Sequence, residues 1–256
     1  MVPEVEMKER IRIRVIVPIT GLSVAALDNR KETLNRFKAD STEVDFTVIR
    51  EGPSSIESIY DEEYAAQETL RELVRAEQEG ANAAILWCAG DPVIGAAREL
   101  VSIPVVGPGE ASFHVAAMLA DRFTVLTTLS SLIPMTRRQV QASGLLTKLA
   151  SVRALELPVL DLESVEDEAF QRAADAVQQA IREDGAEAIV LGCMGMINLS
   201  EKLAAHFRDK GVSIPIVNPG ISSLKVAEML ATMRLSHSKI TYPMPRKTEE
   251  MKKIST

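Results

Sequence analysis

The sequence predicts an α/β protein made of two similar halves, and two patterns in the chain indicate this. Short apolar segments rich in β-branched residues alternate with longer segments in which apolar residues recur at helical spacing. Continuous apolar strands separated by helices are typical of parallel sheets that helices cover on both faces, joined by right-handed crossovers. The second pattern is an internal repeat, which makes one half a copy of the other.

The predicted strands are short apolar runs, and helical segments separate them. The strands cover residues 11–17, 44–49, 83–87, 103–106, 123–127, 152–157, 188–191 and 214–217. The clearest helical period lies at residues 57–79, 165–183 and 222–233. The alternation of the two kinds of segment predicts β-α-β units along the chain.

The repeat is visible in two pairs of matching segments. The segment from Gly80 (GANAAILWCAGDP) matches the segment from Gly185 (GAEAIVLGCMGM). The segment from Ser102 (SIPVVGPGEASFHVAAMLA) matches the segment from Ser213 (SIPIVNPGISSLKVAEMLA). Two copies of one α/β half should pack about a pseudo-twofold axis, with a cleft between the carboxyl ends of their sheets.

The repeat also places the two cysteines of the chain at equivalent positions. Cys88 and Cys193 each follow a predicted strand and each precede a turn that contains glycine. Inversion of a carbon stereocentre needs a base on one face of the carbon and an acid on the other, which a thiolate and a thiol can supply. A single buried cysteine is more often a small apolar core residue. Two cysteines at duplicated strand ends instead predict a catalytic pair.

The turn after Cys88 predicts how its thiol is activated. Asp91 and Pro92 have the pattern of a helix N-cap followed by proline in the first helical position. A thiol near a helix N-terminus has a lowered pKa, whereas an unperturbed thiol is only about 3% thiolate at pH 7. We therefore expect a lowered pKa for Cys88.

Composition argues against several classes of protein. The chain of 256 residues has a net charge of −7, whereas a nucleic-acid partner favours a basic surface. The sequence has neither a signal-peptide pattern nor a membrane-spanning segment, so we expect a cytoplasmic protein with free thiols. His114, His206 and His237 are scattered, so no metal site is expected, and no motif indicates another cofactor. Three methionines at helical spacing are predicted to fill a core: Met118, Met229 and Met233.

Five blocks occur in order along the chain: residues 52–57 with 60–62, 88–92 with 97–100, 104–107 with 110–111, 125–128 and 191–196. Together they resemble the aspartate/glutamate/hydantoin racemase superfamily, most closely its hydantoin and allantoin racemase branch. The resemblance covers the chain from about residue 11 to residue 233.

The resemblance implies two flavodoxin-like halves related by a pseudo-twofold axis. Residues 1–108 form the first half, completed by the last helix and tail, 219–256, and residues 109–218 form the second. It implies cofactor-independent racemisation of a small hydantoin-like or amino-acid-derived substrate, with Cys88 and Cys193 as the acid/base pair, in a homo-oligomer. The implied substrate-binding residues are Pro18, Thr20, Ala89, Gly90, Thr127, Thr128, Met194 and Gly195.

The chain departs from the branch after its first strand. Val17 and Ile19 stand where the branch usually has asparagines, so two amide side chains are replaced by apolar ones. A pocket without these partners predicts a substrate that is less polar than hydantoin or allantoin, or differently arranged. Two alternatives stay open: an isomerase of the maleate type that uses the same cysteines, and a binding protein without turnover. The basic tail from Ser236 is expected to be mobile or to lie on a neighbouring subunit.

Overall fold

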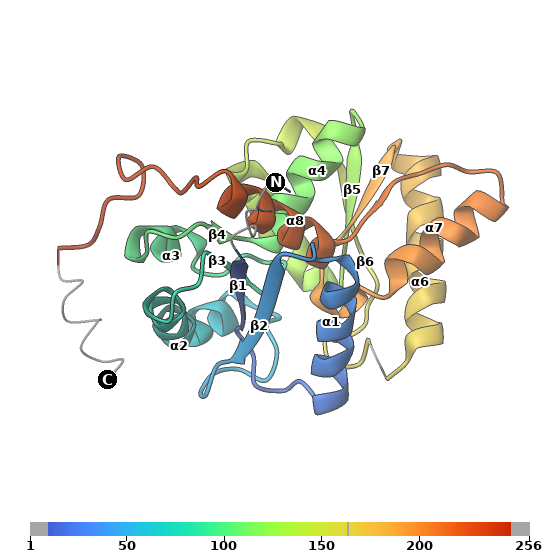
Figure 1. Ribbon diagram of the computed structural model, residues 1–256. Coiled ribbons are helices and arrows are strands. Elements are labelled where there is room, and N and C mark those ends of the chain that lie inside the picture. The colour runs from blue at the N-terminus through green and yellow to red at the C-terminus, as the bar shows by residue number, and fades with distance from the viewer. Residues whose placement is uncertain (1–9, 163, 247–256) are drawn as a thin grey trace, which may run out of the picture.

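The protein contains two four-stranded parallel sheets of the same topology (Figure 1). The computed structural model describes residues 10–162 and 164–246. The strand orders are β2-β1-β3-β4 and β6-β5-β7-β8, so each strand of the second sheet repeats one of the first. The predicted α/β class with two duplicated parallel-sheet halves is therefore confirmed.

The eight predicted strands are all present. Their bounds are β1 Ile11–Val17, β2 Thr42–Val48, β3 Ala83–Leu86, β4 Val105–Val106, β5 Phe123–Thr127, β6 Leu149–Ala154, β7 Ala188–Leu191 and β8 Ile216–Val217. The largest difference is in β6, which was predicted to end at Leu157. Glu156 has a φ of 54°, which interrupts regular pairing, although Leu155 and Leu157 still donate backbone hydrogen bonds to the carbonyls of Thr127 and Thr128.

Eight α-helices connect and cover the strands in the described part of the chain. They are α1 Val24–Phe37, α2 Ile59–Gln78, α3 Ile94–Leu100, α4 Pro108–Leu119, α5 Ile133–Ala142, α6 Glu166–Gln179, α7 Leu199–Asp209 and α8 Pro219–Thr232. The predicted helix over 165–183 continues beyond α6 as a π-helical turn, Ala180–Asp184.

Alternate residues of each sheet pack on different helices. In the first sheet Val15 and Ile85 join the core under α1 and α8, and Ile16 and Leu86 join the core under α2 and α3. In the second sheet the two cores lie under α4 and α5 and under α6 and α7. Because successive strand residues point to opposite faces, a continuous apolar strand fills both cores.

The last helix crosses back onto the first half. Leu224 and Ala227 of α8 join the core of the first sheet, as Phe113 and Ala116 of α4 join that of the second. Helices α4 and α8 also contact each other (Figure 1). The division into residues 1–108 with 219–256 and residues 109–218 remains our interpretation of this arrangement, and its ends at 1–9 and 247–256 lie outside the described residues.

The expectation that three methionines fill a core is wrong. Met118, Met229 and Met233 are 79%, 50% and 58% exposed. Met118 and Met229 occupy equivalent positions of the repeat, and both lie on the outer faces of α4 and α8. The inner faces of these helices are occupied by the residues that pack on the sheets, so helical spacing alone did not identify the buried face.

The described part of the tail packs on its own chain. The backbone N–H of Val105 donates a hydrogen bond of 2.9 Å to Nε2 of His237. Nζ of Lys239 donates to the carbonyls of Arg98 and Val101, each at 2.7 Å, and so satisfies acceptors at the C-terminal end of α3. Residues 236–242 therefore contact their own chain, and a contact with a neighbouring subunit stays a prediction.

Candidate active site

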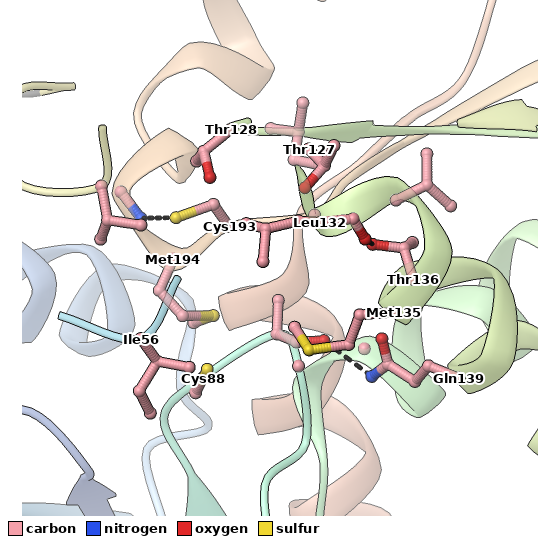
Figure 2. Close-up of a pocket in the computed structure, with 18 of the residues that line it drawn as sticks. Ile56, Cys88, Thr127, Thr128, Leu132, Met135, Thr136, Gln139, Cys193 and Met194 are labelled. Atoms are coloured by element: carbon pink, nitrogen blue, oxygen red, sulfur yellow. Dashed lines mark hydrogen bonds between the residues drawn. The ribbon is translucent and has the colours of Figure 1, made fainter. Parts of the chain in front are cut away.

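The carboxyl ends of β3 and β7 meet at one cavity, and each carries a cysteine. Cys88 lies two residues after β3 and Cys193 two residues after β7. Both line a cavity whose empty space, its open mouth included, is about 800 Å³. Figure 2 shows the two thiols on different sides of this cavity, with Thr127 and Thr128 next to Cys193. Cys88 and Cys193, which the repeat makes equivalent, thus line the same cavity.

Each thiol accepts a hydrogen bond from the backbone N–H of the glycine that lies two residues further along the chain. The N–H of Gly195 donates to Sγ of Cys193 at 3.4 Å, and the N–H of Gly90 donates to the thiol of Cys88. Each donor lies two residues after its cysteine, in the turn that was predicted to stabilise negative charge. A hydrogen bond to the ionised sulfur favours the thiolate, so each turn supports a base at its cysteine.

The pKa of Cys88 is nevertheless raised, so the expectation of a lowered value is wrong. Burial is the largest cause, because it disfavours the charged thiolate. Negative charge at Glu62, Cys193 and Asp91 raises the pKa further, and the contact from Gly90 opposes these effects only in part. At neutral pH the unliganded protein therefore holds Cys88 as a thiol, the form that donates a proton.

Asp91 has a different role from the predicted N-cap. Helix α3 begins only at Ile94, and both Asp91 and Val93 have positive φ angles, 53° and 52°. The carboxylate of Asp91 instead accepts N–H groups from Gly109 and Glu110, at 2.9 and 2.6 Å, in the first turn of α4. Asp91 therefore caps α4, whose N–H groups lie 18 and 19 residues further along the chain. Helix α3, which follows Cys88 in the chain, does not begin at the thiol.

Gln139 joins this arrangement from α5. Its Nε2 donates to the carbonyl of Ala89 at 2.8 Å and to the carboxylate of Asp91 at 2.9 Å. The pKa of Asp91 is raised to about 7, because the effect of burial outweighs the lowering effect of the N–H groups of Glu110 and Gly109 and of the Gln139 amide. The turn after Cys88 is thus fastened to the second half of the protein. The sequence pattern indicated no role for Gln139.

Two buried polar groups in the cavity wall have no hydrogen-bond partner among the described residues. They are the hydroxyl of Thr128 and the indole N–H of Trp87, whose side chains are 1% and 3% exposed. Buried polar groups in native proteins are nearly always paired, so an unpaired one in a cavity wall is a candidate ligand contact. Thr128 was predicted to bind substrate, whereas Trp87, the only tryptophan in the chain, was missed although it directly precedes Cys88.

Six of the eight predicted substrate-binding residues line the cavity: Ala89, Gly90, Thr127, Thr128, Met194 and Gly195. Pro18 and Thr20 do not. Thr20 is exposed, and its hydroxyl donates to the carbonyls of Gly52 and Pro53 at 3.3 and 3.1 Å. It holds the loop before α2 instead of facing the cavity.

The remaining wall is largely apolar. Ile19, Leu22, Ile56, Leu132, Met135 and Val159 all line the cavity. Val17, the other position where the related branch has asparagine, is fully buried in the core under α1 and α8. Of the two apolar replacements, only Ile19 can therefore contact a ligand directly.

A hydrogen bond joins the two halves at the edge of the cavity. Helix α2 begins at Ile59 with Ser58 as its N-cap, so Glu57 lies just before the helix rather than in its first turn. Oε1 of Glu57 accepts the backbone N–H of Val159 at 2.7 Å. The neighbouring Ile56 and Val159 both line the cavity, so this bond fixes part of its wall.

Neither a metal cluster nor a membrane-spanning helix is found in residues 10–162 and 164–246. No three His, Cys, Asp or Glu side chains in these ranges are grouped so as to hold a metal ion. None of the described helices is both long and apolar enough to cross a membrane.

Two duplicated α/β halves with a cysteine from each in a shared cavity define a class of isomerase. The chain belongs to the Asp/Glu/Hydantoin racemase family, whose family model matches residues 13–227. Relatives that are at least 30% identical to the chain are named hydantoin racemase or allantoin racemase, and the protein is an isomerase of this racemase type.

Three relatives specify the branch. The chain is 32% identical to a hydantoin racemase of Pseudomonas sp. (strain NS671) over 93% of each chain. It is 34% identical to a hydantoin racemase of Rhizobium meliloti, over 91% of this chain and 95% of the relative. Its structure resembles that of an allantoin racemase from Klebsiella pneumoniae, with a TM-score of 0.85 and 33% identity over 92% of this chain and 94% of the other.

Proposed function

We propose that the protein is a cofactor-independent racemase that inverts the C5 stereocentre of hydantoins with apolar 5-substituents. The observation that carries this proposal is the placement of Cys88 and Cys193 at equivalent strand ends around one cavity. One thiolate removes the C5 proton from one face of the ring, and the other thiol delivers a proton to the opposite face. The reverse pair of steps serves the other enantiomer.

The protonation state of Cys88 in the free protein supports an assignment of the acid and the base in the first step. Burial and the neighbouring carboxylates keep Cys88 protonated in the free protein, so Cys88 is the acid of the first step, and the two-thiol scheme assigns the role of base to Cys193. After one inversion the proton has moved from Cys88 to the product and from the substrate to Cys193. The resting state then serves one enantiomer and the product state serves the other.

The cavity wall supports a ring with two polar edges and an apolar substituent. The unpaired hydroxyl of Thr128 and indole N–H of Trp87 can donate to ring carbonyls, where negative charge develops as the proton leaves. Ile19, Leu22 and Ile56 offer apolar contacts to the substituent. This division of the wall favours 5-alkyl or 5-aryl hydantoins over allantoin, whose substituent is a polar ureido group.

The test is a screen for loss of optical activity and for uptake of solvent deuterium at C5. The panel contains both enantiomers of 5-benzyl-, 5-isobutyl- and 5-methylhydantoin, allantoin, free amino acids and maleate. We expect racemisation to be fastest for the bulky hydantoins, in protein dialysed against a chelator. Isomerisation of maleate without C5 exchange would identify the maleate type instead, and ligand binding without any exchange would identify a binding protein.

Two further expectations belong to this proposal. We propose that the protein works as a homo-oligomer, which sedimentation velocity would test at micromolar concentration. We also propose a cytoplasmic location, which fractionation of the source cells would test.

A further inference from the structure

Glu62 lies directly behind the turn that carries Cys88. It stands in the first turns of α2, and its Oε1 is buried without a hydrogen-bond partner among the described residues. Glu62 is not part of the cavity wall, and the proposed racemisation does not use it. An unpaired buried carboxyl oxygen costs free energy, so its retention calls for an explanation.

Gly90 is what allows this carboxyl to approach the thiol. A Cβ atom at position 90 would lie 2.7 Å from Oε1 of Glu62 and 3.6 Å from Sγ of Cys88. Any side chain there would displace the carboxyl group. With glycine at this position, Glu62 and Cys88 flank the same small space, and the charge on Glu62 acts on the thiol.

The surroundings of Glu62 suit proton exchange at neutral pH. Its pKa is raised to about 7, chiefly by burial and also by the charge of Glu63, against the lowering effect of Arg138 in α5. A group with a pKa near the working pH gives and takes a proton with equal ease. The side chain of Glu62 is also partly exposed, so it connects the Cys88 thiol to solvent.

The proposed two-thiol reaction requires such a connection. After each inversion Cys88 has lost its proton and Cys193 has gained one. Before the enzyme can convert the same enantiomer again, the free enzyme must return to a protonated Cys88 and an ionised Cys193. Glu62 reaches Cys88 from outside the mostly apolar cavity, so it offers the thiol a route to solvent protons besides the cavity mouth.

We propose that Glu62 is a proton-relay residue that restores the thiol of Cys88 between turnovers. Protonated Glu62 gives its proton to the Cys88 thiolate, and the resulting carboxylate takes a proton from water at the protein surface. Over the same interval the Cys193 thiol gives its proton to water at the mouth of the cavity, so one proton enters and one leaves. The opposite transfer serves the other enantiomer. This inference rests on the proposed function.

The first test measures the Cys88 thiol without any substrate. Alkylation by iodoacetamide is followed from pH 6 to 10 in Cys193→Ser and in Cys193→Ser/Glu62→Gln. Removal of the negative carboxylate should accelerate alkylation of Cys88 about 3- to 10-fold at pH 8 to 9. Glu63→Gln in the same background is the matched control, because Glu63 is exposed and one residue away, and it should leave the rate nearly unchanged.

The second test measures turnover in one direction from a pure enantiomer. The step in which the free enzyme regains its starting protonation state limits the rate at saturating substrate but not at low substrate. Glu62→Gln should therefore lower kcat about 10-fold or more and leave kcat/KM within about twofold. Glu62→Asp, which keeps the carboxyl group, should recover part of kcat. Asp175→Asn, which removes an exposed carboxylate of α6, is the control and should behave as the unmodified protein does.

The outcomes separate the relay from the proposed function. If Glu62→Gln changes neither alkylation nor kcat, the relay is wrong. If it accelerates alkylation but leaves kcat unchanged, Glu62 is only an electrostatic neighbour and the relay is also wrong. If the unmodified protein racemises no hydantoin in the panel, the proposed function fails, and the relay fails with it.

Discussion

Replacement of each cysteine by serine tests the proposed mechanism most directly. An alcohol is a far weaker acid than a thiol, so each replacement removes one of the two proton-transfer groups but leaves the other. Cys88→Ser and Cys193→Ser should each lower inversion by about 10²- to 10⁴-fold, the usual contribution of one general acid or base. Each variant should still exchange the C5 hydrogen of one enantiomer with solvent, and the two should prefer opposite enantiomers.

Because the pKa of Cys88 is raised, the rate of hydrogen exchange should depend on pH differently in the two serine variants. In Cys193→Ser the remaining base is Cys88, which burial and nearby carboxylates keep protonated. Its thiolate fraction, and with it the exchange rate, should rise about tenfold per pH unit from pH 7 to 9. The increase in exchange rate should reverse when the pH is lowered again. The Cys193→Ser variant should unfold at close to the temperature at which the unmodified protein unfolds.

The assay is deuterium incorporation at C5 of each pure enantiomer, followed by proton NMR in buffered D₂O. Two results would refute the reasoning. One is racemisation by either variant at close to the native rate. The other is exchange of the same enantiomer by both variants, because two thiols that face opposite sides of one carbon cannot share a preference.

Three further predictions concern the cavity and its surroundings. Thr128→Val should raise the free energy of unfolding in urea, because it removes an unpaired buried hydroxyl, yet lower kcat/KM about 2- to 10-fold; an unchanged kcat/KM would exclude this hydroxyl from substrate binding. Ile19→Asn should lower kcat/KM for 5-benzylhydantoin about tenfold relative to allantoin, and an unchanged ratio would show that Ile19 does not select the substituent. The pKa of Glu62 is raised from 4.5 to about 7 on folding, so its protonated form stabilises the fold below pH 4.5 and this contribution is lost as pH rises through 7. Urea unfolding at pH 5 and pH 8 should therefore show a smaller loss of stability with pH in Glu62→Gln, and an identical loss would contradict the buried carboxyl.

Much of the site could be predicted because the repeat carries information over a long distance. Cys88 and Cys193 lie far apart in the chain, and no local pattern connects them. The duplication makes them equivalent, and equivalent strand ends in two facing halves must lie around one cleft. The six predicted substrate-binding residues that line the cavity were implied by the family resemblance, and each lies within four residues of the end of β3, β5 or β7.

The failures concern contacts between residues that no local pattern relates. Asp91 has the sequence of an N-cap for the following helix, but its carboxylate caps α4 and accepts the amide of Gln139. The exposed Met118 and Met229 have helical spacing, but spacing does not say which face of a helix meets a sheet. Trp87 became a candidate donor only when the structure showed its indole N–H to be buried without a partner.

The sequence by itself determined the two parallel sheets, their duplication and the pairing of the two cysteines. These properties follow from the apolar period and from similarity between segments, both of which are present in the chain before it folds. Only the tertiary structure decided the protonation of Cys88, the position of Glu62 behind Gly90 and the capping of α4 by Asp91. The physical reason is that a pKa depends on burial and on charges nearby in space, and folding alone brings those charges together.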